Sequence, residues 1–318
     1  MSRDALAIDV LGLGCATVDD LIYLPHHPHP ERKLRIEREE RHGGGLVATA
    51  LVAAARDEAR AAWLAVLGDD VLSQFVRREL DGAGVNCSLV ATERGARPFH
   101  SRVLVALDTR TRSVLFSREG ARWPPPGSVD ETLLARTRVL FLDHYGIGSD
   151  PDLVWRARRA GVPVVADIER INVDGVEAAL PAIDHLILPA HFAREITGAS
   201  SAREAATALW NDARAVVVVT EGAEGAWFVA AHVDHRHAMG PRPHHVPAFA
   251  VTLVDPTGCG DVFHGVYAAA LAVGVPLEQR LRRASAAAAI KATRIGAQNG
   301  APRRAEIDSF LRERQATR

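Results

Sequence analysis

Residues 254–265 read Val-Asp-Pro-Thr-Gly-Cys-Gly-Asp-Val-Phe-His-Gly, and they join an apolar, strand-like run to an Ala-rich helix that we expect to begin near Asp261. Gly258 and Gly260 have no Cβ, so the backbone can turn tightly there and direct successive N–H groups at one point. Unpaired amides and the positive end of the helix dipole attract an anion to that point. The stretch therefore predicts a phosphate-binding turn.

Asp261 adds a carboxylate to this turn. A negative charge beside an anion site is costly unless it has a task, and a suitable task is to accept the proton of a hydroxyl group that attacks a phosphoryl group. Asp is also common at helix N-termini, and a lone Gly-x-Gly-Asp is most often only a turn. The residues alone leave a catalytic base and a helix cap both open.

Length and composition indicate a globular protein with no polyanionic partner. The 318 residues can bury one large core or two modest ones, and the 38 Lys and Arg residues balance the 39 Asp and Glu residues. We therefore expect neither nucleic acid nor a membrane surface as a partner. No apolar stretch reaches the roughly 20 residues of a membrane span. The first ten residues lack the apolar core of a signal peptide, so we expect a soluble, cytoplasmic protein.

The cysteines and histidines do not predict a disulfide framework or a metal centre. The cysteines are Cys15, Cys87 and Cys259, an odd number at wide spacing, which fits a reducing compartment. Eight of the fourteen histidines gather at 26–29, 232–237 and 244–245. These clusters lie among prolines and polar residues without helical ligand spacing, so surface loops are favoured over a metal site.

The order of apolar runs predicts an α/β fold with an inserted hairpin. Between residues 139 and 220, strand-like runs alternate with helix-like segments, which is typical of a parallel sheet covered by helices on both faces. Segment 98–119 instead reads strand, turn, strand, and such a hairpin does not belong inside a parallel sheet. Together with segment 15–42, which contains a strand-like run at 33–40, it predicts a small separate sheet. We expect one domain over residues 1–318.

Two stretches resemble signatures of the PfkB/ribokinase-like carbohydrate kinases. Residues 255–265 are similar to the C-terminal signature Asp-Thr-Thr-Gly-Ala-Gly-Asp-x-Phe-x-x-Gly, with Pro256 and Cys259 as departures. The three glycines 43–45 before a small-residue helix resemble the N-terminal signature, with Ala48 where Asn is usual. The two motifs are most similar to those of the sulfofructose kinase and ribokinase branches. The resemblance implies the ribokinase-like three-layer fold, with segments 15–42 and 98–119 forming a β-sheet lid.

The resemblance also implies ATP-dependent phosphorylation of an exocyclic hydroxymethyl group of a sugar, with Mg²⁺ bridging the β- and γ-phosphates. The implied catalytic groups are the Asp261 base and an anion hole at Gly258, Cys259 and Gly260. The implied sugar-binding residues are Asp19, Lys33, Gly43 and Gly44, and the nucleotide-binding ones are Thr220, Gly222, Gly225 and Ser285. A monovalent cation, K⁺, would lie among Asp255, Thr257, Lys291, Arg294 and Gly296. The lid would exclude water from the sugar and pair with a second subunit in a homodimer.

Some departures from the family leave the substrate open. The Asn-x-x-Glu that orders the Mg²⁺ shell would fall at 189–192 and is absent, while Glu195 lies one helical turn further on. Tyr145 and Phe116 stand where the sulfofructose branch carries Arg and Asn, which argues against a sulfonated sugar. Gly300 also lacks a hydroxyl that ligates the cation in ribokinase.

Three other readings stay in consideration. A nucleoside kinase shares these motifs but needs an aromatic or apolar clamp for its base. A sugar-binding regulator without catalysis is compatible with Ala48 and with the missing Asn-x-x-Glu. A dinucleotide oxidoreductase is disfavoured, because the Gly-x-Gly at 12–14 lacks its third glycine and is followed by prolines instead of a helix.

Overall fold

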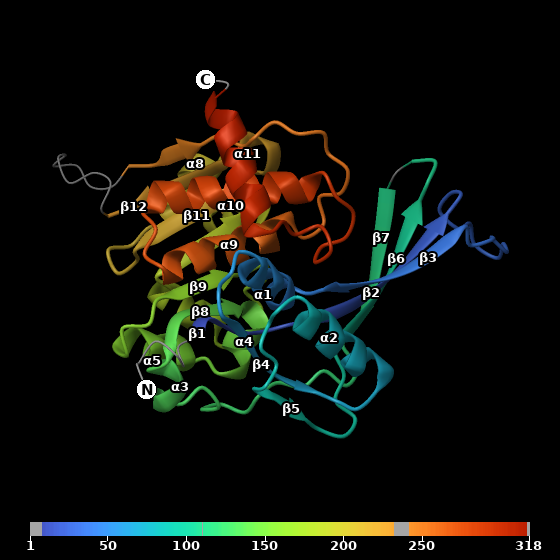
Figure 1. Cartoon of the computed structure of the whole chain (residues 1–318), viewed down its shortest axis with the longest axis horizontal. Helices are drawn as coiled ribbons and strands as arrows, with labels where there is room; N and C mark the ends of the chain where they lie inside the picture. Colours follow the sequence, from blue (N-terminus) through green and yellow to red (C-terminus); the bar gives the residue numbers. More distant parts are fainter. Residues whose placement is uncertain (1–7, 110, 232–241, 317–318) are drawn as a thin grey trace.

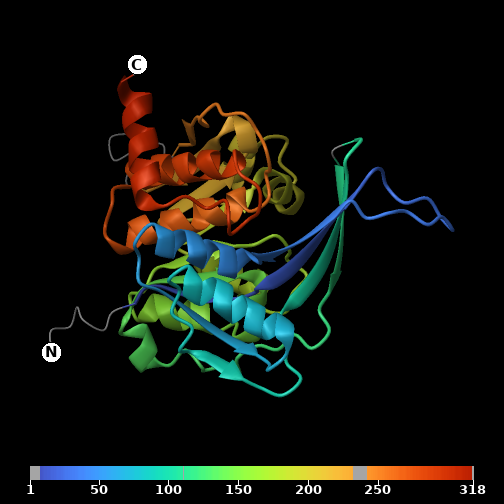
Figure 2. The same cartoon turned by 45° about the vertical axis from the view of Figure 1, so that its right-hand side comes forward.

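The computed structural model describes residues 8–109, 111–231 and 242–316. It contains a nine-stranded sheet with helices on both faces and a four-stranded sheet that stands to one side of it (Figure 1). The turned view shows the same separation of the two sheets (Figure 2). This arrangement confirms the predicted α/β fold, with a mostly parallel central sheet and a smaller, separate sheet.

The nine-stranded sheet has the order β13-β12-β11-β10-β9-β8-β1-β4-β5. Neighbours from β11 to β5 pair in parallel, whereas β12 and β13 extend one edge in antiparallel pairing. The strands are β1 Ile8–Leu13, β4 Ala61–Leu67, β5 Val90–Thr92, β8 Thr137–Asp143, β9 Val164–Asp167, β10 His185–Pro189, β11 Val216–Thr220, β12 Ala226–Ala230 and β13 His244–Val246. Central strands such as β1 and β4 are buried along their whole length, because helices cover both faces.

Two apolar cores lie on the two faces of this sheet. On one face the core residues come from α1 Leu46–Arg56, α2 Val71–Gly82, α9 Cys259–Ala272, α10 Leu277–Ala292 and α11 Arg304–Ala316. On the other they come from α3 Glu131–Leu134, α4 His144–Ser149, α5 Leu153–Arg159, α6 Val176–Ala179, α7 Ala190–Thr197 and α8 Ala202–Ala208. Short 3₁₀ turns occur at Leu180–Ala182 and Gly222–Glu224. No helix over the described residues is long and apolar enough to cross a membrane.

The four-stranded sheet has the order β3-β2-β6-β7. Its strands are β2 Thr17–Leu24, β3 Arg38–Gly44, β6 Phe99–Ala106 and β7 Thr111–Ser117. β2 and β6 pair in parallel, and the outer pairs are antiparallel. The strand expected at 33–40 begins only at Arg38, because its partner β2 ends at Leu24, directly before Pro25.

The apolar run before Asp255 was expected to be a strand, and this expectation is wrong. Residues 247–258 have no regular structure. Pro247, directly after β13, has no amide hydrogen to continue a ladder, and the amides of Val254 and Asp255 donate instead to the carbonyl of Ala292 at the end of α10. This connection ties the start of the glycine turn to the C-terminus of α10.

The histidine clusters differ in their environment. Residues 26–29 lie in the turns after β2, as expected, whereas His244 and His245 form strand β13 and not a loop. The cluster at 232–237 lies outside the described residues. Over the described part of the chain, no group of three or more His, Cys, Asp or Glu side chains is placed to hold a metal ion.

Candidate active site

The glycine turn leads directly into α9. Gly258 is the residue before the helix and has φ 77°, a left-handed conformation that favours glycine, and a Cβ there would lie 2.6 Å from the Cβ of Ala297. The amide of Cys259 donates to the carbonyl of Pro256 at 3.2 Å. The expected three-amide anion hole is therefore corrected: the amide of Cys259 is used inside the turn. Those of Gly258 and Gly260 have no acceptor among the described residues.

Asp261 lies in the first turn of α9 and borders a pocket of about 570 Å³. Asp167 and Glu169, at the C-terminal end of β9, border the same pocket. The other lining residues are Leu46, Arg112, Pro189, Ala190, His191, Arg194, Thr220, Glu221, Gly222, Pro256, Thr257, Gly258, Cys259, Gly260 and His264. The carboxyl ends of β9, β10 and β11 and the N-terminus of α9 thus meet around one space, as expected for a ligand site in an open α/β sheet.

The carboxyl groups in this pocket repel one another. Burial raises the pKa of Asp261 well above its usual range, and the nearby Asp167 and Glu169 carboxylates raise it further. Burial also raises the pKa of Asp167 and of Glu169. Such a cluster is unfavourable by itself and is stabilised by a bound cation or a proton.

His264 connects the glycine turn to the sheet. Its Nδ1 lies 2.8 Å from the carbonyl oxygen of Gly260 and 3.3 Å from a carboxylate oxygen of Asp167. Its Nε2 lies 3.1 Å from the carbonyl oxygen of Ile187 on β10. The buried imidazole therefore holds the first turn of α9 at a defined position relative to β9 and β10.

Arg112 brings a positive charge from the four-stranded sheet to the glycine turn. It lies on β7, and its guanidinium donates to the hydroxyl of Thr257 and lies 3.7 Å from the carboxylate of Asp255. Both partners belong to the stretch that precedes α9. One end of the four-stranded sheet thus contacts the glycine turn.

The expected nucleotide-binding residues separate into two groups. Thr220 and Gly222 line the pocket, whereas Gly225 and Ser285 do not. Gly225 has φ 96°, and a Cβ there would lie 2.1 Å from the carbonyl oxygen of Val246, so this glycine serves the contact between β12 and β13. Ser285 lies part-buried on α10.

The expected sugar-binding residues lie at the junction of the two sheets, except for one. The carboxylate of Asp19 on β2 accepts a hydrogen bond from the hydroxyl of Thr17 at 3.1 Å. Burial raises the pKa of Asp19, while hydrogen bonds from Ser101 and Thr17 act in the opposite direction. A Cβ at Gly44 would lie 2.3 Å from an Asp19 carboxylate oxygen. Lys33 lies exposed in the connection between β2 and β3.

Gly43 has a packing role next to this junction. It is buried near the end of β3, and a Cβ there would lie 2.2 Å from the amide oxygen of Gln298. The amide nitrogen of Gln298 donates to the carbonyl of Gly44 at 3.2 Å. Glycine at position 43 leaves room for this close approach of the Gln298 amide to the main chain of β3.

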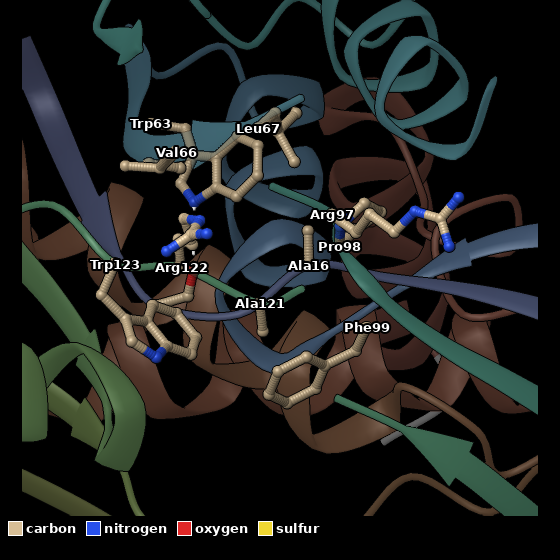
Figure 3. Close-up of a pocket in the computed structure, with 12 residues that line it drawn as sticks. Ala16, Trp63, Val66, Leu67, Arg97, Pro98, Phe99, Ala121, Arg122 and Trp123 are labelled. Carbon is tan, nitrogen blue, oxygen red and sulfur yellow. Dashed lines mark hydrogen bonds between the residues drawn. The ribbon is translucent and has the colours of Figure 1, made fainter. Parts of the chain in front are cut away.

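An aromatic group lies beside Asp19. Phe99 precedes Ser101 on the same face of β6, and its ring contacts Tyr145 edge to face at 5.0 Å between ring centres. Tyr145 is stacked on Trp123 at 5.4 Å. Figure 3 shows Phe99 and Trp123 on one side of a small pocket and Trp63 on the other. That pocket holds only about 20 Å³, room for a water molecule and not for a sugar.

The residues expected around a monovalent cation lie together in the structure. The ammonium of Lys291 lies among the oxygen atoms that would bind such a cation. The Asp255 carboxylate accepts hydrogen bonds from the amides of Thr257 and Gly296, each at 2.9 Å. The ammonium of Lys291 donates to the main-chain carbonyls of Asp255 and Arg294.

Four residues of the site were not expected from the sequence: Arg112, Asp167, Glu169 and His264. Asp167 ends a predicted strand and Glu169 follows it, so the rule that ligands bind at the carboxyl ends of parallel strands would have singled them out. His264 stands inside the quoted stretch, but its contacts with β9 and β10 are long-range. No local pattern marks Arg112, because its role depends on how the two sheets meet.

The fold and the site define an α/β protein that offers free amides at a helix N-terminus beside a carboxylate, an arrangement suited to a phosphate-containing ligand. The profile of the pfkB family carbohydrate kinases matches residues 9–304. The chain therefore belongs to the pfkB family of carbohydrate kinases. This confirms the expected family, and with it the expected enzyme class of sugar kinase.

Individual relatives agree with this assignment. The chain is 28% identical over 309 residues to a ribokinase from Haemophilus influenzae, a match that covers 94% of this chain and 97% of the ribokinase. It is 30% identical over 285 residues to the bifunctional protein HldE from Stutzerimonas stutzeri, covering 86% of this chain but only 56% of HldE.

Solved structures share the fold over nearly the whole chain. A putative ribokinase from Agrobacterium tumefaciens has a TM-score of 0.80 at 25% identity, covering 96% of this chain and 98% of that one. The ribokinase from Arabidopsis thaliana, solved with ribose and ATP, has a TM-score of 0.82 at 22% identity, covering 96% and 99% of the two chains. At such identities the second similarity shows the fold alone.

Proposed function

We propose that this protein transfers the γ-phosphoryl group of ATP to an exocyclic hydroxymethyl group of a sugar, with Asp261 as the general base. The observation that carries the proposal is the position of Asp261 beside the free amides of Gly258 and Gly260, at the start of a 14-residue helix. Amides and helix dipole stabilise the charge that develops on the transferred group, and the carboxylate takes the proton of the attacking hydroxyl.

The environment of Asp261 affects its strength as a base. Burial and the carboxylates of Asp167 and Glu169 raise its pKa, which makes the carboxylate a stronger base than an exposed Asp. A cation bound in the pocket would counteract this repulsion and keep Asp261 ionised while the acceptor hydroxyl approaches.

Mg²⁺ fits the donor set of this pocket. Asp167 and Glu169 supply carboxylate oxygens, the ligands that Mg²⁺ prefers, and they line the same pocket as Pro189, where the family's Asn-x-x-Glu would begin. Mg²⁺ is usually held by one or two carboxylates together with water and substrate phosphates, so two carboxylates are sufficient. When bound, Mg²⁺ supplies positive charge between the β- and γ-phosphates.

ATP and the sugar would bind at different parts of the site. Thr220 and Gly222, at the carboxyl end of β11, border the pocket where ATP would lie. Asp19 and Gly44, at the junction with the four-stranded sheet, would hold the sugar through carboxylate and main-chain contacts to its hydroxyl groups. We infer that the four-stranded sheet is the lid that excludes water as a competing acceptor.

A nucleoside kinase is the second candidate, and one observation favours it. Phe99, Tyr145 and Trp123 form a continuous aromatic group next to the face of β6 that carries Ser101, the hydrogen-bond partner of Asp19. A nucleoside would place its base against such a surface, whereas a free sugar has less apolar area to bury there.

Release of ADP tests both candidates. The protein is mixed with ATP, Mg²⁺ and a panel of ketoses, phosphorylated ketoses, aldoses and nucleosides. The proposal expects turnover with a sugar that carries a free hydroxymethyl group, and preferential turnover of nucleosides would establish the second candidate. Binding of a sugar without ADP release from any compound would instead identify a regulator and overturn the kinase proposal.

We also propose that the protein is a homodimer in the cytoplasm. β7 is an edge strand whose residues are all exposed, including Val114, Leu115 and Phe116 at 54%, 57% and 49%. An exposed apolar edge strand can pair with a second copy.

The cysteines Cys15, Cys87 and Cys259 are free thiols, which fits a reducing compartment.

A further inference from the structure

The side chain of Lys291 is fully buried beside the glycine turn. It is 0% exposed, and its ammonium donates to the main-chain carbonyl oxygens of Asp255 at 2.8 Å and Arg294 at 3.0 Å. The Asp255 carboxylate lies 3.8 Å from the same nitrogen. One buried positive charge therefore joins the residue that begins the turn to the loop that follows α10.

These oxygens form the kind of environment that holds a monovalent cation. Main-chain carbonyls that converge on one point can replace the hydration shell of K⁺. They lie near the C-terminal end of α10, where the helix dipole also favours positive charge. An ammonium carries the same charge as K⁺ and satisfies the carbonyls through N–H donors. The residues present consequently do not fit a separate ion, since the ammonium already lies among its ligands.

Gly300 makes room for this lysine. A Cβ at position 300 would lie 2.5 Å from Cδ of Lys291, 3.0 Å from Cε and 2.8 Å from the carbonyl oxygen of Gly296. The lysine stem thus fills the space in which a side chain at 300 would stand. Glycine at position 300 therefore both removes the hydroxyl ligand and makes room for the lysine side chain.

The choice of lysine is unusual for this chain. Of the 38 Lys and Arg residues, only Lys33 and Lys291 are lysines. An ammonium is a compact charge with three donors, whereas a guanidinium is a planar fork suited to carboxylates and phosphates. A small group of carbonyl oxygens accommodates a compact charge better than a planar one. Lysine, and not arginine, at position 291 therefore fits this site.

The Asp255 carboxylate offsets part of the cost of burying the Lys291 ammonium. Burial lowers the pKa of Lys291, and the Asp255 carboxylate counteracts that effect. Burial would raise the pKa of Asp255, but hydrogen bonds from Thr257 and Gly296 and the charge of Lys291 lower it overall. The two groups form an ion pair whose members are each held by further hydrogen bonds.

We propose that the Lys291 ammonium permanently takes the place of the monovalent cation expected from the family resemblance, so that the anion-binding turn needs no K⁺. The activity readout rests on the proposed kinase function. The stability readout does not, because it uses the protein without substrates.

The first test compares chloride salts of K⁺, Na⁺ and tetramethylammonium at constant ionic strength. The unmodified protein is expected to have the same Tm and the same rate of ADP release, within about twofold, in all three salts. A Tm or a rate that rises specifically with K⁺ would overturn the inference. If no compound is phosphorylated, the kinase proposal fails while the Tm comparison still decides the role of Lys291.

The second test uses two substitutions of the same residue. Lys291→Ala removes the ammonium and opens space among the carbonyls, so its Tm is expected to fall and to recover partly in K⁺ but not in tetramethylammonium. Lys291→Met removes the charge but fills the space, so its Tm is expected to fall in every salt without specific recovery. Arg282→Met, on the same helix, controls for loss of a positive charge. A Lys291→Ala protein that shows no specific response to K⁺ would contradict the inference.

Discussion

At the scale of single residues, the site depends on Asp261. The Asp261→Asn substitution keeps the size of the side chain and removes its ability to accept a proton. We expect turnover to fall by about 10²–10⁴-fold, the usual contribution of a general base, with ATP and sugar affinity within a few-fold of the original. ADP release and equilibrium binding measure the two effects. Asp212→Asn, in an exposed loop, is the control, and full activity of the Asp261 variant would eliminate the proposed base.

Asp261 should also affect how stability depends on pH. Its pKa in the folded protein lies above the ordinary value of 3.8, so the folded state holds its proton at higher pH than the unfolded state does. The stability associated with this proton is complete below pH 3.8 and is lost as pH rises through the folded pKa. Asp261→Asn should therefore be more stable than the unmodified protein at pH 7.5, with a smaller difference at pH 4.5. Urea unfolding at both values measures this, and a difference independent of pH would contradict it.

At the scale of elements, α1 and α9 must approach closely to place the glycine turn. A Cβ at Gly265 on α9 would lie 2.0 Å from the carbonyl oxygen of Ala50 on α1. Gly265→Ala should therefore lower the free energy of unfolding by about 1–3 kcal/mol, as overpacking usually does. Gly82→Ala is a matched control, because a Cβ at the end of α2 meets nothing within 4 Å. Equal stability of the two variants in urea would show that the helices can separate without cost.

The contact between β7 and the glycine turn makes a second prediction at this scale. Arg112 reaches Thr257 and Asp255 from the four-stranded sheet and borders the pocket, so it adds positive charge near the proposed phosphate position. Arg112→Gln should lower kcat/KM about tenfold or more while changing Tm little, because the Arg112 side chain is 46% exposed. Steady-state kinetics in ATP and a thermal melt separate the two readouts. Unchanged kcat/KM would limit Arg112 to a structural contact.

At the scale of the whole molecule, the exposed edge of the four-stranded sheet determines the expected assembly. If β7 pairs with a second copy, a charge placed on its apolar surface should dissociate the dimer. Leu115→Asp should therefore sediment as a monomer at concentrations where the unmodified protein sediments as a dimer. Val71→Asp, at an exposed position on α2, should leave the assembly unchanged. Monomeric sedimentation of the unmodified protein would contradict the homodimer.

Several features of the fold could be predicted because their causes are local. The alternation of apolar runs and helix-like segments predicted the parallel sheet, since buried parallel strands require continuous apolar residues. The strand–turn–strand pattern at 98–119 predicted the separate sheet, because such a hairpin does not belong inside a parallel sheet. The prediction of a strand before Asp255 was wrong. Pro247 has no amide hydrogen, and the carbonyl of Ala292 accepts the hydrogen bonds that the following amides would otherwise donate to a neighbouring strand. That competition joins residues far apart in the chain, which a local pattern does not contain.

The amino-acid sequence by itself determined the fold class, the family and the position of the glycine turn, because these follow from periodicity, from residues without a Cβ and from their spacing. Only the tertiary structure decided which groups surround Asp261, where Arg112 makes its contact and what lies among the carbonyls near Asp255. Each of these depends on distances between segments that are remote in the chain. Lys291 is the clearest case: the family resemblance placed it only near an expected cation, and the fold places its ammonium within hydrogen-bond distance of the carbonyls of Asp255 and Arg294.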